Sequence, residues 1–236
     1  MKVLNSIKFK VDLKLSFSII THSKPWITAN DRRIVDQTIK SGLIAQGKLV
    51  KEFEENMATY LEVKNSVAFS SGTAALIAAL RSLEIKSNQE VILPSYVCQS
   101  VLEAVQSSGG KPVLCDVGNH WNMTVDAVTQ KITNNTAAII VVHIFGIPVN
   151  THEFKQLGFP IIEDCAQAFG ARVNSSYVGT LGTIGIFSFH ATKCLTTGEG
   201  GLAISSDPSI INKVRTLRDG NYKTLKTRIP APMSDI

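Results

Sequence analysis

The residue whose chemistry stands out is a lysine placed where an apolar, strand-like stretch runs into a glycine-rich turn. Lys193 lies in the stretch GIFSFHATKCLTTGEGG, residues 185–201 of the 236-residue chain. A lysine attacks a carbonyl as its neutral amine, and a partly desolvated site near other positive charge favours that form. The hydroxyls of Ser188 and Thr192 could hold an anion beside it. The stretch therefore predicts a covalent anchor for an aldehyde carried on a phosphate, namely pyridoxal phosphate; the alternative is an ordinary strand-to-loop turn that contains a lysine.

A second turn has the composition of an anion site. Residues 67–69 form a short apolar stretch that leads into Ser70–Thr73 and then into a helix predicted over residues 74–83. Free backbone N–H groups and the dipole at a helix start attract a phosphate, and Gly72 lets the backbone approach it closely. The alternative is an ordinary Ser/Thr helix cap. The spacing is not that of a P-loop and there is no G-x-G-x-x-G, so a Walker ATPase or a nicotinamide site is disfavoured.

A carboxylate and an amide follow a third apolar stretch. Residues 160–164, PIIED, are predicted to form a strand that ends at Asp164, and Gln167 lies three residues further on. A carboxylate at the end of a buried strand needs a cationic partner or several hydrogen-bond donors. The protonated nitrogen of a pyridine ring is such a partner, and the Gln167 amide could donate to the oxygen on that ring. The alternatives are a helix N-cap for Asp164 and a solvated polar side chain for Gln167.

These side chains depend on the elements that hold them. From residue 66 onward, apolar strand-like stretches alternate with helical ones, which predicts an α/β fold with a mostly parallel central sheet and helices on both faces. Two amphipathic helices, over residues 31–41 and 50–61, come before this alternation. Ligands of such sheets bind at the carboxyl ends of the strands. The polar clusters expected there are Ser70–Thr73, Ser95–Tyr96, Asp164–Gln167 and Ser188–Lys193.

Composition narrows the classes of function. The chain is 44% hydrophobic and 18% charged, with a net charge of +5 and scattered basic residues, so a nucleic-acid surface is not expected. No apolar run is long enough to span a membrane, and lysines interrupt any signal-peptide core in residues 1–22, which are predicted to be an N-terminal extension. The cysteines form no C-x-x-C pair and the histidines show no metal-ligand spacing. We therefore expect free thiols, a cytoplasmic protein and no metal.

Three runs of residues carry a resemblance to a known family. They are SSGTAAL (70–76), IIEDCAQAFGA (161–171) and FSFHATKCLTTGEGG (187–201), in this order. With these runs the chain resembles the DegT/DnrJ/StrS sugar aminotransferases, which are pyridoxal-phosphate enzymes of fold type I. The resemblance implies that residues 23–236 form the cofactor-binding large domain of that fold, incomplete at its C-terminus, and that the small C-terminal domain is largely absent.

The same resemblance implies a role for each candidate residue. Lys193 would hold the cofactor as a Schiff base and shuttle a proton between two carbons. Asp164 would pair with the pyridine nitrogen, and Gln167 would contact the ring oxygen. His143 is expected to be structural or to lie near the cofactor, whereas for His190 a direct role and a loop or packing role both remain open. The cofactor phosphate would be bound by Gly72, Thr73 and Ser188.

The activity implied by the resemblance is transfer of an amino group, from glutamate or glutamine, to a nucleotide-linked keto-sugar for polysaccharide or antibiotic-sugar synthesis. A homodimer is expected if the protein is complete. Lys193 disfavours the related sugar 3-dehydrases, in which histidine replaces the lysine. Cys98 occupies a position where family members often have an aromatic residue that stacks on the cofactor ring. The chain also stops where the family continues, so the alternative is a truncated, inactive remnant or the N-terminal half of a split aminotransferase.

Overall fold

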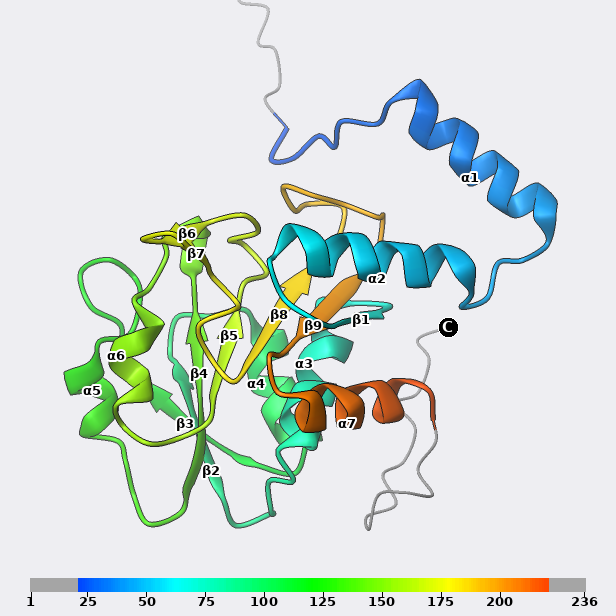
Figure 1. Ribbon diagram of the computed structural model, residues 1–236. Coiled ribbons are helices and arrows are strands. Elements are labelled where there is room, and N and C mark those ends of the chain that lie inside the picture. The colour runs from blue at the N-terminus through cyan, green and yellow to red at the C-terminus, as the bar shows by residue number, and fades with distance from the viewer. Residues whose placement is uncertain (1–20, 221–236) are drawn as a thin grey trace, which may run out of the picture.

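The computed structural model describes residues 21–220, which form an α/β structure around one seven-stranded sheet (Figure 1). In spatial order the strands are β1 (Ser66–Phe69), β9 (Gly201–Ile204), β8 (Ile184–Ser188), β5 (Ile161–Asp164), β4 (Thr136–Val142), β2 (Glu90–Pro94) and β3 (Lys111–Cys115). Neighbouring strands from β8 to β3 run parallel, whereas β9 is antiparallel to both β8 and β1. The carboxyl ends of all these strands except β9 therefore lie at one edge of the sheet.

Helices cover both faces of the sheet, as Figure 1 shows. One face packs against α3 (Gly72–Ser82), α4 (Gln99–Ser107) and α7 (Pro208–Arg218). The other face packs against α2 (Lys48–Tyr60), α5 (Val125–Thr129) and α6 (Thr151–Lys155). The short 3-10 helix η1 (Ile144–Gly146) follows β4, and α1 (Ala29–Ser41) lies apart from the sheet.

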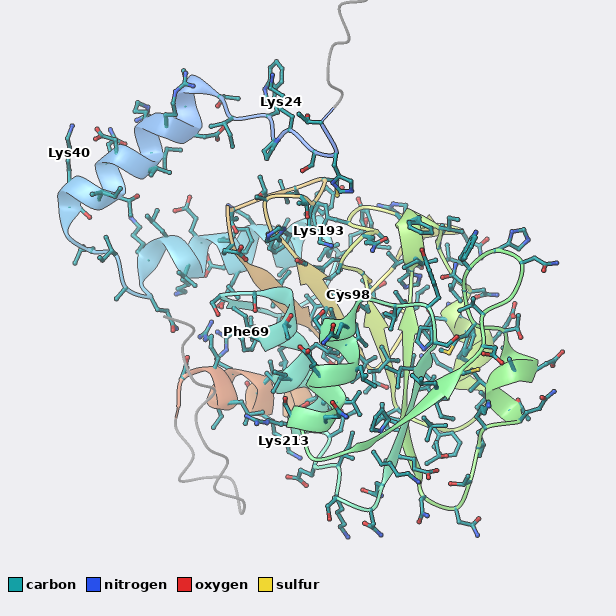
Figure 2. All side chains as sticks on the ribbon, turned by 180° about the vertical axis from the view of Figure 1, so that it is seen from behind. Lys24, Lys40, Phe69, Cys98, Lys193 and Lys213 are labelled. Atoms are coloured by element: carbon teal, nitrogen blue, oxygen red, sulfur yellow. The ribbon has the colours of Figure 1, made fainter. Side chains whose placement is uncertain are left out.

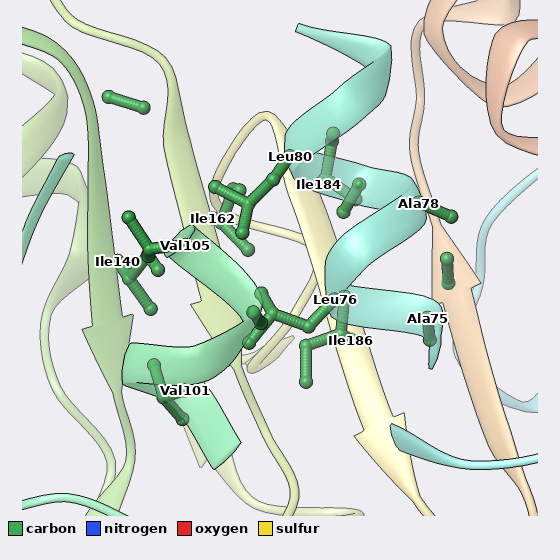
Figure 3. Packing of buried hydrophobic residues seen from close by; sticks show 14 of the residues in the cluster. Ala75, Leu76, Ala78, Leu80, Val101, Val105, Ile140, Ile162, Ile184 and Ile186 are labelled. Atoms are coloured by element: carbon green, nitrogen blue, oxygen red, sulfur yellow. The ribbon is translucent and has the colours of Figure 1, made fainter. Parts of the chain in front are cut away.

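Alternation along the central strands divides the core between the two faces. In β4, Ile140 and Val142 belong to the core cluster on the α3 and α4 face, whereas Ile139 and Val141 belong to the cluster on the α5 and α6 face. Figure 3 shows side chains of α3 and α4 gathered over Ile140 and the neighbouring strands. Burying each such side chain contributes about 1.5–3 kcal/mol. This two-sided burial explains why the sequence around β4 is almost continuously apolar.

The predicted α/β fold, with a mostly parallel sheet and helices on both faces, is confirmed. The hairpin of β6 (Arg172–Val173) and β7 (Ser176–Tyr177) was not predicted, because strands of two residues are too short to show a period. The helix predicted over residues 31–41 is present as α1, but none of its residues is buried. The predicted extension over residues 1–22 lies almost entirely outside the described residues. Within residues 21–220, no helix combines the length and apolarity needed to cross a membrane.

Within the described residues β1 has a neighbouring strand on its β9 side alone, and side chains form hydrogen bonds with its other edge. The backbone N–H of Ala68 donates to Glu54 Oε1 at 2.8 Å, and Arg215 Nη2 donates to the backbone oxygen of Ser66 at 2.9 Å. Arg215 and Arg218 both pair with the Glu54 carboxylate, which is buried. This cluster joins α2, β1 and α7, and it fixes the strand that leads into the turn before α3.

We expect Glu54→Ala to lower the free energy of unfolding by about 3 kcal/mol, because it removes the buried carboxylate that accepts from Arg215, Arg218 and the Ala68 N–H and leaves Arg218 paired with Asp219 alone. Urea unfolding followed by circular dichroism measures this. The matched control is Glu55→Ala, which removes an exposed carboxylate paired with Lys51 and should change stability by less than about 0.5 kcal/mol. Equal losses in the two variants would contradict the role assigned to Glu54.

Candidate functional site

A cavity of about 340 Å³ lies at the edge of the sheet where β1, β5 and β8 end. Of the four polar clusters predicted there, the one at Ser95–Tyr96 reaches the lining only through the residues that follow it, Val97 and Cys98. The structure brings all six residues singled out from the sequence to this lining, namely Gly72, Thr73, Asp164, Gln167, Ser188 and Lys193. Apolar side chains complete the walls, among them Leu76, Val101, Val142, Ile144 and Ile186.

Lys193 lies in the loop between β8 and β9, and Figure 2 shows it at the end of the sheet near Cys98. The loop ends are held together because β8 and β9 are adjacent and antiparallel. The Phe189 N–H donates to the Gly200 oxygen at 2.8 Å, and the Lys193 N–H donates to the His190 oxygen at 2.9 Å. The Lys193 side chain is half-buried, and its amine has no hydrogen-bond or ion-pair partner within residues 21–220. A preordered loop thus presents a free amine to the cavity.

The N-terminus of α3 forms a second wall of the cavity. Ser71 caps the helix, and its hydroxyl accepts the Ala74 N–H at 3.1 Å. The cap leaves the first two N–H groups of the helix, on Gly72 and Thr73, without a partner in the described structure. A Cβ atom at Gly72 would lie only 2.8 Å from the Cβ of Ser188, so glycine is what allows the helix start to meet the end of β8. The predicted alternative of a helix cap is therefore present at Ser71, and the N–H groups of Gly72 and Thr73 beside it stay available to an anion.

Asp164 ends β5 with its side chain almost fully buried at the cavity. Its Oδ1 accepts the Ala166 N–H at 2.9 Å, and its Oδ2 accepts no hydrogen bond from the residues that the structure describes. Burial raises the pKa of Asp164 above its ordinary range, although the Ala166 N–H and the neighbouring His143 and Lys193 act against the rise. A carboxylate in this setting is stabilised by a bound cation.

Gln167 lies in the turn after β5 and lines the same cavity. Its Oε1 accepts the backbone N–H of Phe145 at 2.7 Å. Because a backbone N–H can only donate, this bond fixes the orientation of the amide. The Nε2 of Gln167 has no partner in the described part of the chain, so it remains free to donate.

Comparison with known proteins assigns the chain to a family. The sequence matches the DegT/DnrJ/EryC1/StrS aminotransferase family over residues 25–228. The chain belongs to this family. Aminotransferases of the family use pyridoxal phosphate.

Individual relatives agree with the family assignment. GDP-perosamine synthase of Escherichia coli O157:H7 is 35% identical over 196 residues, which are 80% of this chain and 54% of that protein. UDP-N-acetyl-3-dehydro-alpha-D-glucosamine 3-aminotransferase of Acidithiobacillus ferrooxidans is 39% identical over 185 residues, covering 75% of this chain and 50% of the relative. The chain thus spans about half the length of these curated relatives.

Solved structures share the fold. Helicobacter pylori PseC, an aminotransferase involved in the biosynthesis of pseudoaminic acid, matches with a TM-score of 0.82 and 27% identity, over 92% of this chain and 60% of PseC. The PLP-form of Spr1654 from Streptococcus pneumoniae matches with a TM-score of 0.80 and 29% identity, over 84% of this chain and 57% of that one. The expected type I fold of pyridoxal-phosphate enzymes is therefore confirmed for the matched part.

In this member of the DegT/DnrJ/EryC1/StrS family, His143 is a fully buried residue directly after β4. Its Nδ1 accepts the Val149 N–H at 3.0 Å, so the ring proton is on Nε2 when the imidazole is neutral. Nε2 lies 3.1 Å from Oε2 of Glu163 and donates to it. Both ring nitrogens are therefore engaged in holding the chain together, which agrees with the structural role expected for His143.

Glu163 precedes Asp164 in β5 and serves a different purpose. Its Oε2 also accepts the Thr151 hydroxyl at 2.8 Å, and its Oε1 accepts the backbone N–H groups of Leu181 and Gly182. Burial acts to raise the pKa of Glu163, but the hydrogen bonds from His143, Gly182 and Thr151 outweigh it, so the pKa is lowered. Glu163 remains ionised and fixes the loop before β8, the strand that leads into the loop of Lys193.

Three further polar residues line the cavity, namely His190, Glu199 and Cys98. His190 Nδ1 is 2.8 Å from the Thr192 hydroxyl, and His190 Nε2 is 3.4 Å from Glu199 Oε1. Glu199 was not predicted from the sequence, because it lies in a glycine-rich turn where an exposed carboxylate carries no special signal. Cys98, at the position expected for a ring-stacking aromatic, lines the cavity from the start of α4.

Proposed function

We propose that this chain carries the pyridoxal-phosphate site of an aminotransferase that transfers an amino group, from glutamate or glutamine, to a nucleotide-linked keto-sugar. One observation carries the proposal: a free amine, a buried carboxylate with an unpaired oxygen and the N-terminus of an 11-residue helix converge on one cavity. An amine suits the aldehyde of the cofactor, a carboxylate suits its ring nitrogen and a helix start suits its phosphate. The nucleotide-linked substrate is supported by the names of relatives that contain GDP and UDP.

The residues present fit this cofactor. The unpaired Oδ2 of buried Asp164 lacks a cationic partner, and the close approach of Gly72 to Ser188 leaves a cradle that a side chain on Gly72 would fill. When bound, pyridoxal phosphate supplies an electron sink for bonds broken at the carbon beside it. We propose that residues 23–236 belong to one cofactor-binding domain that is incomplete at its C-terminus, preceded by an extension over residues 1–22. We also propose a cytoplasmic protein that is a homodimer when complete.

Each side chain then has a distinct task. Lys193 holds the cofactor through its ε-amine and, once released, takes up and returns a proton at that nitrogen. Asp164 keeps the ring nitrogen protonated, and Gln167 Nε2 donates to the ring oxygen. The phosphate is bound by the N–H groups of Gly72 and Thr73 and by the hydroxyls of Thr73 and Ser188.

The apolar walls of the cavity assist this chemistry. Leu76, Val142 and Ile186 lie beneath the polar groups and belong to the buried core. They keep bulk water from one side of the site, so that the charge on Asp164 acts through a medium of low dielectric constant.

The proposal is tested by trapping the cofactor. The purified chain is incubated with pyridoxal phosphate, reduced with borohydride, digested and mapped by mass spectrometry. We expect an adduct confined to Lys193, together with turnover of amino donor and a nucleotide-linked keto-sugar. Labelling spread over surface lysines such as Lys40 would refute the site. A specific adduct without turnover would limit the chain to cofactor binding, as expected for an inactive or split aminotransferase.

A further inference from the structure

Three aromatic side chains gather beside the candidate site and remain half exposed. Tyr96, Trp121 and Phe145, here called the aromatic rim, have 45%, 51% and 59% of their surface exposed. The ring centroid of Tyr96 lies 5.0 Å from that of Trp121 and 6.1 Å from that of Phe145, and Trp121 and Phe145 lie 6.5 Å apart. The three residues come from the segments that follow β2, β3 and β4, so the edge of the sheet that carries the cavity also gathers the rim.

Two of the three rings are held on a strained backbone. Trp121 has φ 63° and Phe145 has φ 54°, in the left-handed region that residues with bulky side chains rarely adopt. Asn122 ties the two segments together: its Oδ1 accepts the Ile144 N–H at 3.2 Å and its Nδ2 donates to the Ile147 oxygen at 3.3 Å. Backbone strain that persists at exposed aromatic residues points to a use for those side chains.

The aromatic rim is continuous with the cavity but does not line it. The backbone N–H of Phe145 donates to Gln167, and Tyr96 directly precedes Val97 and Cys98, which are part of the lining. The rim therefore lies next to the cavity without being part of its lining. A substrate whose reacting carbon lies at Lys193 could reach the rim with the part that is most distant from that carbon.

We propose that the aromatic rim binds the base of the nucleotide carried by the sugar substrate, a proposal that rests on the function given above. Nucleobases stack on aromatic side chains, and tyrosine, tryptophan and phenylalanine provide such platforms. The rings of the rim are tilted against one another by 48° to 79°, so their faces are not used up by parallel stacking among themselves. The rim thus contributes affinity for the nucleotide and leaves the chemistry to the residues inside the cavity.

The test uses GDP and UDP as probes of the protein loaded with pyridoxal phosphate. The chain has two tryptophans, Trp26 and Trp121, so a Trp26→Phe background makes Trp121 the single reporter. We expect saturable quenching of its fluorescence by at least one of the two nucleotides. In the same background, binding is compared by calorimetry for Trp121→Gly and for Trp121→Phe, which retains an aromatic ring.

We expect about tenfold weaker nucleotide binding for Trp121→Gly and a change of less than about threefold for Trp121→Phe. Glycine suits the φ of 63° at this position, so the fold should persist, and an adduct still confined to Lys193 would show this. Nucleotide affinity that is unchanged in Trp121→Gly, with the adduct intact, would overturn the rim proposal and leave the proposed function standing. So would a shift of Trp121→Gly toward monomer in sedimentation at unchanged affinity, which would make the rim a contact between copies.

Failure of the proposed function has a different signature. Nucleotide binding that depends on Trp121 in a chain that forms no Lys193 adduct would support the rim and refute the aminotransferase. An intact adduct with no binding of GDP or UDP at millimolar concentration would overturn the rim proposal alone.

Discussion

Lys193→Ala should abolish the borohydride-stable adduct and reduce aminotransferase activity by about 10³–10⁴-fold. The variant loses both the amine that bonds to the cofactor and the base that moves the proton, and proton transfer alone contributes about 10²–10⁴-fold. Lys193→Arg separates charge from chemistry, because the guanidinium keeps the positive charge but does not form the covalent bond. Both variants should still bind pyridoxal phosphate through the α3 N-terminus, with an absorbance spectrum close to that of the free aldehyde.

The matched control for this experiment is Lys40→Ala, which removes an exposed lysine of α1 that pairs with Asp36. It should leave the adduct and the turnover unchanged. An adduct that persists at another lysine in Lys193→Ala, with turnover within tenfold of the parent, would show that the chemistry does not depend on Lys193.

Asp164→Asn should change activity and stability in opposite directions. The amide cannot keep the ring nitrogen of the cofactor protonated, and losing this electrostatic support should lower turnover by about 10²–10³-fold. In the cofactor-free protein, the same change removes a buried charge whose Oδ2 has no partner, while the Asn oxygen can still accept the Ala166 N–H. The cofactor-free variant should therefore be more stable at neutral pH, by about 1–3 kcal/mol.

The stability gain expected for Asp164→Asn should depend on pH. Since burial raises the pKa of folded Asp164 above its ordinary value of 3.8, the folded protein binds this proton more tightly than the unfolded chain does. The stabilisation from that proton is complete below pH 3.8 and is lost as the pH rises through the folded pKa. The advantage of Asp164→Asn should thus appear at neutral pH and vanish in acid. Urea unfolding from pH 3.5 to 8 measures it, with exposed Asp116→Asn as control; equal curves for the two variants would contradict the assigned burial effect.

Much of the candidate site could be predicted from the sequence, because its key residues lie at or after the ends of apolar strands. Asp164 and Lys193 each come after a stretch that must be buried, and the carboxyl ends of such strands meet at one edge. Gly72 was predicted because a strand, a small-residue turn and a helix follow one another within a few residues. In each case the information is local, and the sheet then brings the three segments together.

Contacts between segments that are distant along the chain could not be predicted from the sequence. Glu54 meets Arg218, which lies 164 residues further along the chain, and neither residue differs in type from an ordinary surface charge. The aromatic rim is similar: nothing in the sequence around Trp121 or Phe145 indicates a positive φ or the hydrogen bonds by which Asn122 joins their two segments. These features depend on how loops meet, which neither periodicity nor composition records.

The exposed position of α1 has a consequence for deuterium exchange. None of its 13 residues is buried, and Ile34, Val35 and Ile39 are all exposed. The helix is held by its Thr28–Asp31 capping box and by the Lys40–Asp36 ion pair, and a helix of this length is marginal in water by itself. The amides of α1 should therefore exchange through local unwinding of the helix, whereas those of β4 should exchange only when the whole structure unfolds. The exchange rate of α1 amides is thus a direct readout of whether anything covers its apolar side.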